Sequence, residues 1–106
     1  VEALQSMSFD NQDEHYISLL TDSNSKVRVA AMRALASSGN RSHLALFRAR
    51  FEKDDSYLAQ AEALRAIGRI GSLDDLDFLL QASVMPSPRG VLKQAADRAI
   101  AEIGAR

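Results

Sequence analysis

The sequence predicts an all-α fold: a right-handed α-solenoid of stacked antiparallel helix pairs, with about three repeats and a partial one before them. An alanine-rich segment occurs three times, at residues 27–35, 59–67 and 92–100. The copies are 32 and 33 residues apart, a period typical of stacked helical repeats. Their small side chains indicate closely packed helices. A glycine follows each copy at the same distance: Gly39, Gly71 and Gly104.

The first complete repeat is predicted to occupy residues 10–39. Asn11 or Asp10 can cap a helix over about residues 12–21, in which the apolar side chains lie on one side. A polar turn ends this helix. The second helix is then expected over about residues 23–38, ending at a glycine that tolerates a left-handed C-terminal cap.

The next repeats are predicted at residues 40–71 and 72–104, with the same layout but different turns. The sequence Asp-Asp-Ser at 54–56 makes the second turn. In the third repeat, Ser72 can accept a hydrogen bond from the backbone of Asp75 at the start of a helix. The last turn, Pro-Ser-Pro, places its second proline on the first helical position, where the missing N–H does no harm.

Both ends of the chain carry apolar side chains that a neighbouring repeat would cover. Residues 1–7 match the last half of a second helix, so we expect residues 1–9 to be the end of a truncated repeat and residues 1–106 to form one repeat domain excised from a longer protein. These ends are expected to drive weak self-association. The residues concerned are Leu4, Met7, Phe9, Ile100 and Ile103.

Composition disfavours several classes of function. The 106 residues carry a net charge of -1, which gives no general attraction to nucleic acid or to an anionic membrane. The chain has no cysteine, so disulfides and thiolate metal sites are excluded. No apolar run approaches the roughly 20 residues that span a bilayer. We therefore expect a protein partner or an adjoining domain of the same parent chain, and no cofactor.

The repeated segment resembles HEAT-like repeats, and the resemblance extends over nearly the whole chain. Asp22, Val27 and Arg28, followed by Ala-Ala, Ala-Leu and Gly, carry it in the first repeat. In that family the Asp and Arg positions imply a hydrogen-bonding ladder between neighbouring repeats. Only part of this ladder is kept here, so a continuous ladder is not expected. The later repeats carry Asp54 with Gln60, and Ser87 with Lys93.

Residues 51–68 look more narrowly like the HEAT-like C-terminal region of bacterial zinc aminopeptidases of the aminopeptidase N class. The Asp-Ser-Tyr turn followed by Ala-x-Ala-Leu carries this resemblance. The catalytic H-E-x-x-H signature of such enzymes is absent, so the resemblance implies a non-catalytic tail. A scaffold without any peptidase remains the other hypothesis, and upstream sequence would discriminate the two. A third, weaker possibility, a HEAT-like chromophore lyase, has no specific residues to support it.

No catalytic or metal constellation is found. His15 and His43 are the only histidines, and each lacks a second ligand at helical spacing. We expect both to be ordinary, partly exposed helix residues. Gly68 and Gly71 lie at a helix end and do not form a phosphate loop, and no serine lies in a nucleophile elbow.

Arg33, Arg65 and Arg98 occupy the same position in each repeat, so stacking should align them in a row on the side away from the core. One interpretation is a basic ridge facing a ligand, suited to carboxylates or an acidic partner. The favoured alternative is that each arginine pairs with an acidic neighbour. The candidate neighbours are Glu62, Asp97 and Glu102.

A second candidate surface is apolar. Val29 and Met32 in the first repeat correspond to Ala61 and Leu64 in the second. The third repeat has Gln94 and Asp97 there. The favoured interpretation is core packing, because a second helix touches its partner and both neighbours. The alternative is a contact with a partner or catalytic domain that fades toward the C-terminal end.

Overall fold

The computed structural model describes residues 11–106, and all of their regular secondary structure is helical. The predicted all-α fold is therefore confirmed. Residues 1–9, with Leu4, Met7 and Phe9, lie outside the described range. The α-helices are α2 (Asn11–Leu19), α3 (Ser25–Ser37), α4 (Leu44–Lys53), α5 (Tyr57–Ile70), α6 (Leu76–Ser83) and α7 (Val91–Gly104). Short 3-10 turns are η1 (Arg41–His43), η2 (Leu73–Asp75) and η3 (Pro88–Gly90).

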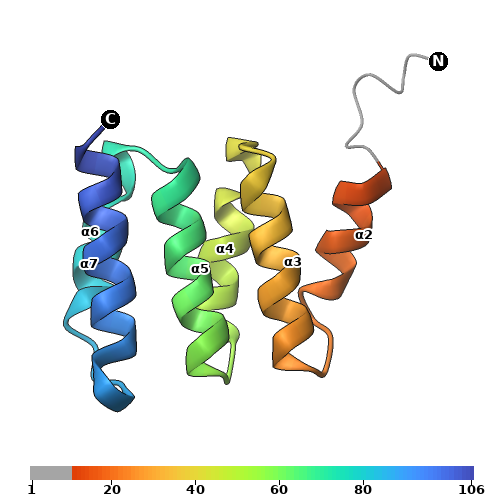
Figure 1. The fold of residues 1–106 in the computed structure, drawn as a ribbon, viewed down its shortest axis with the longest axis horizontal. Coiled ribbons are helices and arrows are strands. Elements are labelled where there is room, and N and C mark those ends of the chain that lie inside the picture. The colour runs from red at the N-terminus through yellow and green to blue at the C-terminus, as the bar shows by residue number, and fades with distance from the viewer. Residues whose placement is uncertain (1–10) are drawn as a thin grey trace.

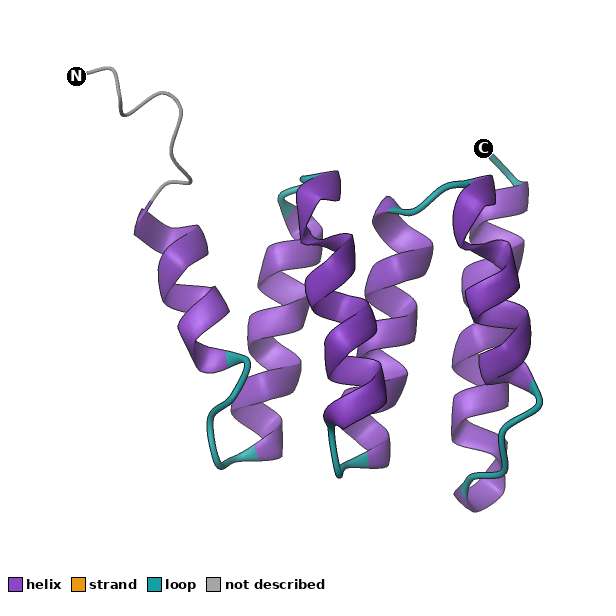
Figure 2. Cartoon of the chain, turned by 180° about the vertical axis from the view of Figure 1, so that it is seen from behind, coloured by secondary structure: helices purple, strands orange, loops and turns teal. Residues whose placement is uncertain are grey.

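The helices form two layers along one long axis, as the predicted solenoid of helix pairs requires (Figure 1). One layer holds the first helix of each pair, α2, α4 and α6, and the other holds the second helices, α3, α5 and α7. Figure 2 shows the array from behind, with α4 and α6 in front of the second helices. Each second helix packs against its own partner and against the next second helix. No helix within residues 11–106 has the length and apolar character needed to cross a bilayer.

The second helices approach one another closely because their facing side chains are small. A Cβ added to Gly68 would lie only 2.6 Å from both the Cα and the Cβ of Ala99 on the next second helix. The first helices α4 and α6 are instead joined through large side chains: the rings of Phe51 and Phe78 meet edge to face with centroids 5.5 Å apart.

The core lies between the two layers. Its largest fully buried apolar residues come from five successive helices: Met32, Leu35, Phe47, Leu64, Ile67, Leu79 and Leu92. Burying a side chain of this size contributes about 1.5–3 kcal/mol. Apolar positions recurring every three or four residues, as predicted from the sequence, form this core.

The three glycines of the repeat end their helices in different ways. Gly39 has a φ of 73°, which confirms the left-handed cap predicted there. Gly71 has a φ of -79°, and its role is to leave space: an added Cβ would meet the Ile67 carbonyl oxygen at 2.5 Å and Asp75 Oδ2 at 2.7 Å. Gly104 is the last residue of α7. The expectation of one shared cap is therefore wrong for the second and third repeats.

The helix starts also differ from one repeat to the next. Helix α3 begins at Ser25, and the side chain of Asn24 caps it by accepting from the Lys26 N–H at 2.9 Å. Ser72 and Asp75 form the predicted capping box. Pro88 opens the η3 turn and does not open α7. That correction has a backbone reason, because the two residues after Pro88 have left-handed φ values of 54° and 65°.

Candidate functional site

The predicted row of arginines lines a hollow on the second-helix layer. Its volume is about 390 Å³, and its floor is made of one alanine from each second helix: Ala36, Ala66 and Ala99. Its polar lining comes from the same three helices: Arg33, Glu62, Arg65, Arg69, Arg98 and Glu102. We call this feature the arginine groove. The row is aligned as the repeat spacing predicts, because stacking keeps equivalent positions next to one another.

Glu62 is the buried centre of the arginine groove. Its side chain is only 7% exposed, and Oε1 accepts from Arg33 Nη2 at 3.2 Å and from Arg65 Nη1 at 3.3 Å. The predicted pairing of arginines with acidic neighbours is confirmed for these two. The equivalent positions in the other repeats are Ala30 and Ala95. Only the middle repeat therefore supplies a carboxylate at this position.

Arg98 does not follow that pattern. Within the described part of the chain, its side chain makes no hydrogen bond or ion pair, and the same holds for the Arg69 side chain. Asp97, one of the expected partners, instead pairs with Lys93 at 2.7 Å on its own helix. The pairing expected for Arg98 is thus wrong. Two exposed guanidinium groups in the arginine groove keep all their donors for an external acceptor.

Three of the four residues of the second candidate surface belong to the core. Met32, Ala61 and Leu64 are completely buried, so no partner can contact them in the folded chain. This corrects their selection as partner-facing residues and agrees with the favoured interpretation, core packing. The physical reason is the wide buried arc of a second helix, which packs against its own partner and against adjacent second helices. Val29 is half-buried and retains a surface role.

An apolar hollow continues the arginine groove toward the N-terminal ends of α3 and α5. Its volume is about 350 Å³, and Arg33, Glu62 and Arg65 line both features. Its apolar wall contains Val29 and Leu58. We call it the Leu58 hollow, since this side chain is 65% exposed. Sequence reasoning missed this residue. The sequence gives one indication of its role: Leu58 precedes Glu62 by one helical turn on α5.

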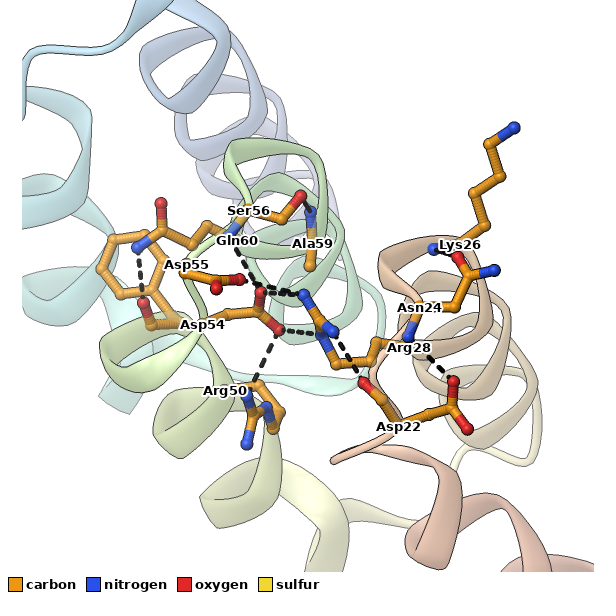
Figure 3. A network of polar contacts seen from close by, with 11 residues as sticks. Asp22, Asn24, Lys26, Arg28, Arg50, Asp54, Asp55, Ser56, Ala59 and Gln60 are labelled. Carbon is orange, nitrogen blue, oxygen red and sulfur yellow. Dashed lines mark hydrogen bonds and ion pairs between the residues drawn. The ribbon is translucent and has the colours of Figure 1, made fainter.

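A buried polar network ties the first repeat to the second (Figure 3). Arg28 Nε donates to Asp54 Oδ2 at 2.8 Å and Nη2 donates to Oδ1 at 2.9 Å. The two side chains are 9% and 0% exposed. Arg28 Nη1 also donates to the Asp22 carbonyl at 2.7 Å. This is the Asp and Arg contact that the HEAT resemblance implied.

The environment of Asp54 favours its ionised form. Burial alone would raise the pKa of this carboxyl, but hydrogen bonds from the Arg28 side chain and the Ser56 N–H outweigh burial and hold it below its ordinary value. Attraction to Arg28 and a bond from Arg50 act in the same direction. The pKa of Arg28 is raised, chiefly by its hydrogen bond to Asp54. Both groups are therefore charged at neutral pH.

The ladder does not continue to the third repeat in the same form, as predicted. Gln60, in the position of Arg28, donates from Nε2 to the Phe51 carbonyl at 2.8 Å within its own repeat (Figure 3). Arg48 on α4 instead forms an ion pair with buried Asp75 at the start of the third repeat. Sequence reasoning did not find this second tie, because these residues are not equivalent positions of the repeat.

The two histidines differ in environment. His15 is exposed, as expected. His43 is only 1% exposed, and its Nε2 lies 3.9 Å from Asp13 Oδ2 on α2. The expectation of a partly exposed residue is wrong for His43, because the η1 turn places it against the first helix pair. No group of three metal-binding side chains occurs in the described part of the chain.

The C-terminal end of the array exposes an apolar stripe on α6 and the η2 turn. Leu73, Leu80 and Val84 are 69%, 52% and 81% exposed. Leu80 lies two residues from Phe78 on α6, so it projects to the side away from this ring, which contacts the preceding repeat; Leu73 lies in the η2 turn and Val84 is the C-cap of α6. We call this feature the α6 end stripe. It replaces the expected end surface, because Ile103 is buried and Ile100 is half-buried.

Two layers of stacked helix pairs with ties between successive pairs define the class of α-solenoid repeat proteins. The family model for HEAT repeats matches residues 14–101, so the chain belongs to the HEAT repeat family. The comparisons with curated proteins and with solved structures gave no match. HEAT repeats are helical scaffolds for protein interaction and are generally non-catalytic.

Proposed function

We propose that this chain is a non-catalytic scaffold that binds a protein partner, or an adjoining domain of its parent chain, through the arginine groove. The observation that carries the proposal is the pair Arg69 and Arg98, whose exposed side chains lie in a hollow across three second helices and make no hydrogen bond or ion pair with the part of the chain that the structure describes. Arginine is enriched at protein interfaces, and its planar group suits carboxylate recognition. No nucleic-acid or membrane partner is expected.

The test of this proposal is a comparison of captured partners. The tagged chain is incubated with a lysate of its source organism, and bound proteins are compared for wild type, Arg69→Glu with Arg98→Glu, and Lys53→Glu. Lys53 is an exposed cation at the end of first helix α4, so it controls for charge reversal outside the groove. The proposal requires a captured protein that the groove variant loses and the control keeps. Equal capture by all three proteins contradicts it.

The alternative is that the chain is the HEAT-like C-terminal region of a zinc aminopeptidase. The resemblance of residues 51–68 supports this alternative, and the groove would then contact the upstream catalytic domain. The sequence upstream of residue 1 discriminates the two hypotheses. An H-E-x-x-H motif there favours the peptidase, whereas further repeats alone favour a scaffold. In either case we expect the isolated chain to release no product from an aminoacyl nitroanilide.

We also propose that the repeat units are residues 10–39, 40–71 and 72–104, after the end of a truncated repeat at 1–9. The two inter-repeat ties support these boundaries, because each joins an arginine of one unit to an acidic residue of the next. A chain lengthened by one upstream repeat should then be more stable than residues 1–106. Equal stability of the two chains contradicts the proposed partial repeat.

A further inference from the structure

The charge and shape of the arginine groove indicate the chemistry of its partner. We propose that the groove binds an acidic peptide segment in an extended conformation, with one apolar side chain in the Leu58 hollow. This inference rests on the proposed function, since it names the part of the partner that the groove contacts. Three observations support it: arginine N–H donors without an acceptor among the described residues, an excess of positive charge in the groove, and the adjoining apolar hollow. The general spacing of packed helices then sets the pattern of the segment.

The guanidinium N–H groups of the groove that have no acceptor among the described residues favour carboxylate ligands. A guanidinium group has five N–H donors in a planar fork. Arg33 and Arg65 each donate once, to the same oxygen of Glu62. The side chains of Arg69 and Arg98 donate to no group within residues 13–106. A side-chain carboxylate can accept two parallel hydrogen bonds from one such fork.

The groove is locally positive although the whole chain is not. Four arginines and two glutamates line it, so two positive charges are in excess, whereas the chain has a net charge of -1. An acidic segment gains from this contrast. A nucleic acid gains less, because its phosphates continue beyond the groove, where a chain of net charge -1 adds no attraction.

The helix spacing sets the pattern of the segment. Neighbouring packed helices lie about 8–10 Å apart. A peptide in the polyproline II conformation turns once every three residues and advances about 9 Å in doing so. Acidic residues at every third position would therefore meet arginines on successive second helices. About nine residues are enough to cross α3, α5 and α7.

The Leu58 hollow fixes the position of the segment. Leu58 and Tyr57 are 65% and 46% exposed, and Leu58 shares its hollow with half-buried Val29 and with two groove arginines. An apolar side chain next to the acidic positions can cover this leucine while its neighbours reach Arg33 and Arg65. The groove alone would bind many acidic segments, so the hollow provides selectivity.

The experiment measures peptide binding by fluorescence anisotropy. The probe is a labelled peptide of about nine residues with Glu at every third position and one Leu beside a Glu, and its scrambled form is the first control. We expect the scrambled peptide to bind at least about fivefold more weakly. Arg98→Glu should weaken binding of the patterned peptide by about fivefold or more, and Lys53→Glu should leave it unchanged. Higher salt should weaken binding, because the screening length falls to about 3 Å at 1 M.

The apolar contact is tested with a double-mutant cycle. Leu58→Ser should weaken binding of the peptide with Leu but not of the same peptide with Ser in its place. Independent effects of the two changes contradict the hollow as the anchor. Equal binding of the scrambled peptide, an unchanged affinity of Arg98→Glu, or tighter binding of a nucleic acid of similar length contradicts the acidic segment.

The failure of this inference is distinct from failure of the proposed function. If no acidic peptide binds but a captured protein still depends on Arg69 and Arg98, the groove is an interface for another chemistry and only this inference is wrong. If neither peptide nor protein binding depends on these arginines, both are wrong. Circular dichroism of each variant verifies its fold, which we expect to be intact because both side chains are exposed.

Discussion

The Arg28 and Asp54 pair should be the largest single electrostatic contribution to the stability of the array. The perturbation is Asp54→Ala. It removes both Arg28 bonds, the bond from the Ser56 N–H at 3.0 Å and the bond from Arg50 at 3.3 Å. Arg28 stays in place with its side chain 9% exposed. It then has only the Asp22 carbonyl and an exposed neighbouring carboxylate as partners.

The expected cost follows from that geometry. Removing one partner of a buried pair leaves the other charge uncompensated and typically costs about 3–5 kcal/mol. Domains of this size usually have about 5–15 kcal/mol of total stability, so the loss is a large fraction. The midpoint of thermal unfolding should fall by at least about 10 °C. Replacing both partners, as in Arg28→Met with Asp54→Leu, should cost less than the sum of the single changes, since no unpaired charge remains.

The assay is urea unfolding followed by circular dichroism, with Gln60→Ala as the matched control. Gln60 occupies the position of Arg28 in the next repeat, but its bond to the Phe51 carbonyl is neutral and lies within one repeat. Its loss should cost about 1 kcal/mol. Hydrogen exchange adds a positional readout. In Asp54→Ala the amides of α2 and α3 should exchange faster than those of α7, because each repeat of a solenoid contacts only its neighbours.

Two results would refute this reasoning. The first is a cost for Asp54→Ala no larger than that for Gln60→Ala, which would mean that the buried pair adds nothing beyond a neutral bond. The second is a uniform increase of exchange across all helices, which would mean that the pair does not act at the first interface.

Further predictions concern pH, packing and association. Because the pKa of Asp54 is lowered in the folded chain, its charge contributes fully to stability above about pH 4 and contributes less as the pH falls further. The difference in the free energy of unfolding between wild type and Asp54→Asn, measured by urea unfolding, should therefore shrink only below about pH 4. Gly68→Ala should lower stability by about 1–3 kcal/mol through overpacking against Ala99, whereas Gly104→Ala, with open space around it, should not lower it; equal effects refute the close contact. Leu80→Glu in the α6 end stripe should reduce concentration-dependent association in sedimentation, and no association of wild type at any concentration contradicts that surface.

The repeat period predicts the fold well because it acts through local rules. An apolar stripe and a run of small residues determine which side of each helix is buried, independently of distant parts of the chain. The same period predicts the arginine row, since stacking places equivalent positions side by side. The repeat period does not predict how many arginines form ion pairs with one carboxylate. Glu62 accepts a hydrogen bond from both Arg33 and Arg65, whereas Asp97, an expected partner of Arg98, pairs with Lys93.

Features that break the repeat could not be predicted from it. The tie between Arg48 and Asp75 joins positions that are not equivalent, and the burial of His43 depends on how α2 lies against the η1 turn. Gly71 has the position of Gly39 but not its conformation, and the space beside it is filled by the Ile67 carbonyl oxygen and the Asp75 carboxylate. Each of these depends on the register between two elements. Register is a property of tertiary packing and has no local sequence signal.

The arginine row itself has an electrostatic cost that differs along the array. Two like charges about 10 Å apart in water repel by roughly 0.4 kcal/mol, and stacking repeats this repulsion wherever an equivalent position is charged. Glu62 relieves it between α3 and α5. At the equivalent position of α7 the chain has Ala95, and within the described residues no carboxylate pairs with both Arg65 and Arg98, which line the same groove. A partner carboxylate would remove repulsion as well as add attraction there, and we therefore expect the strongest contact between α5 and α7.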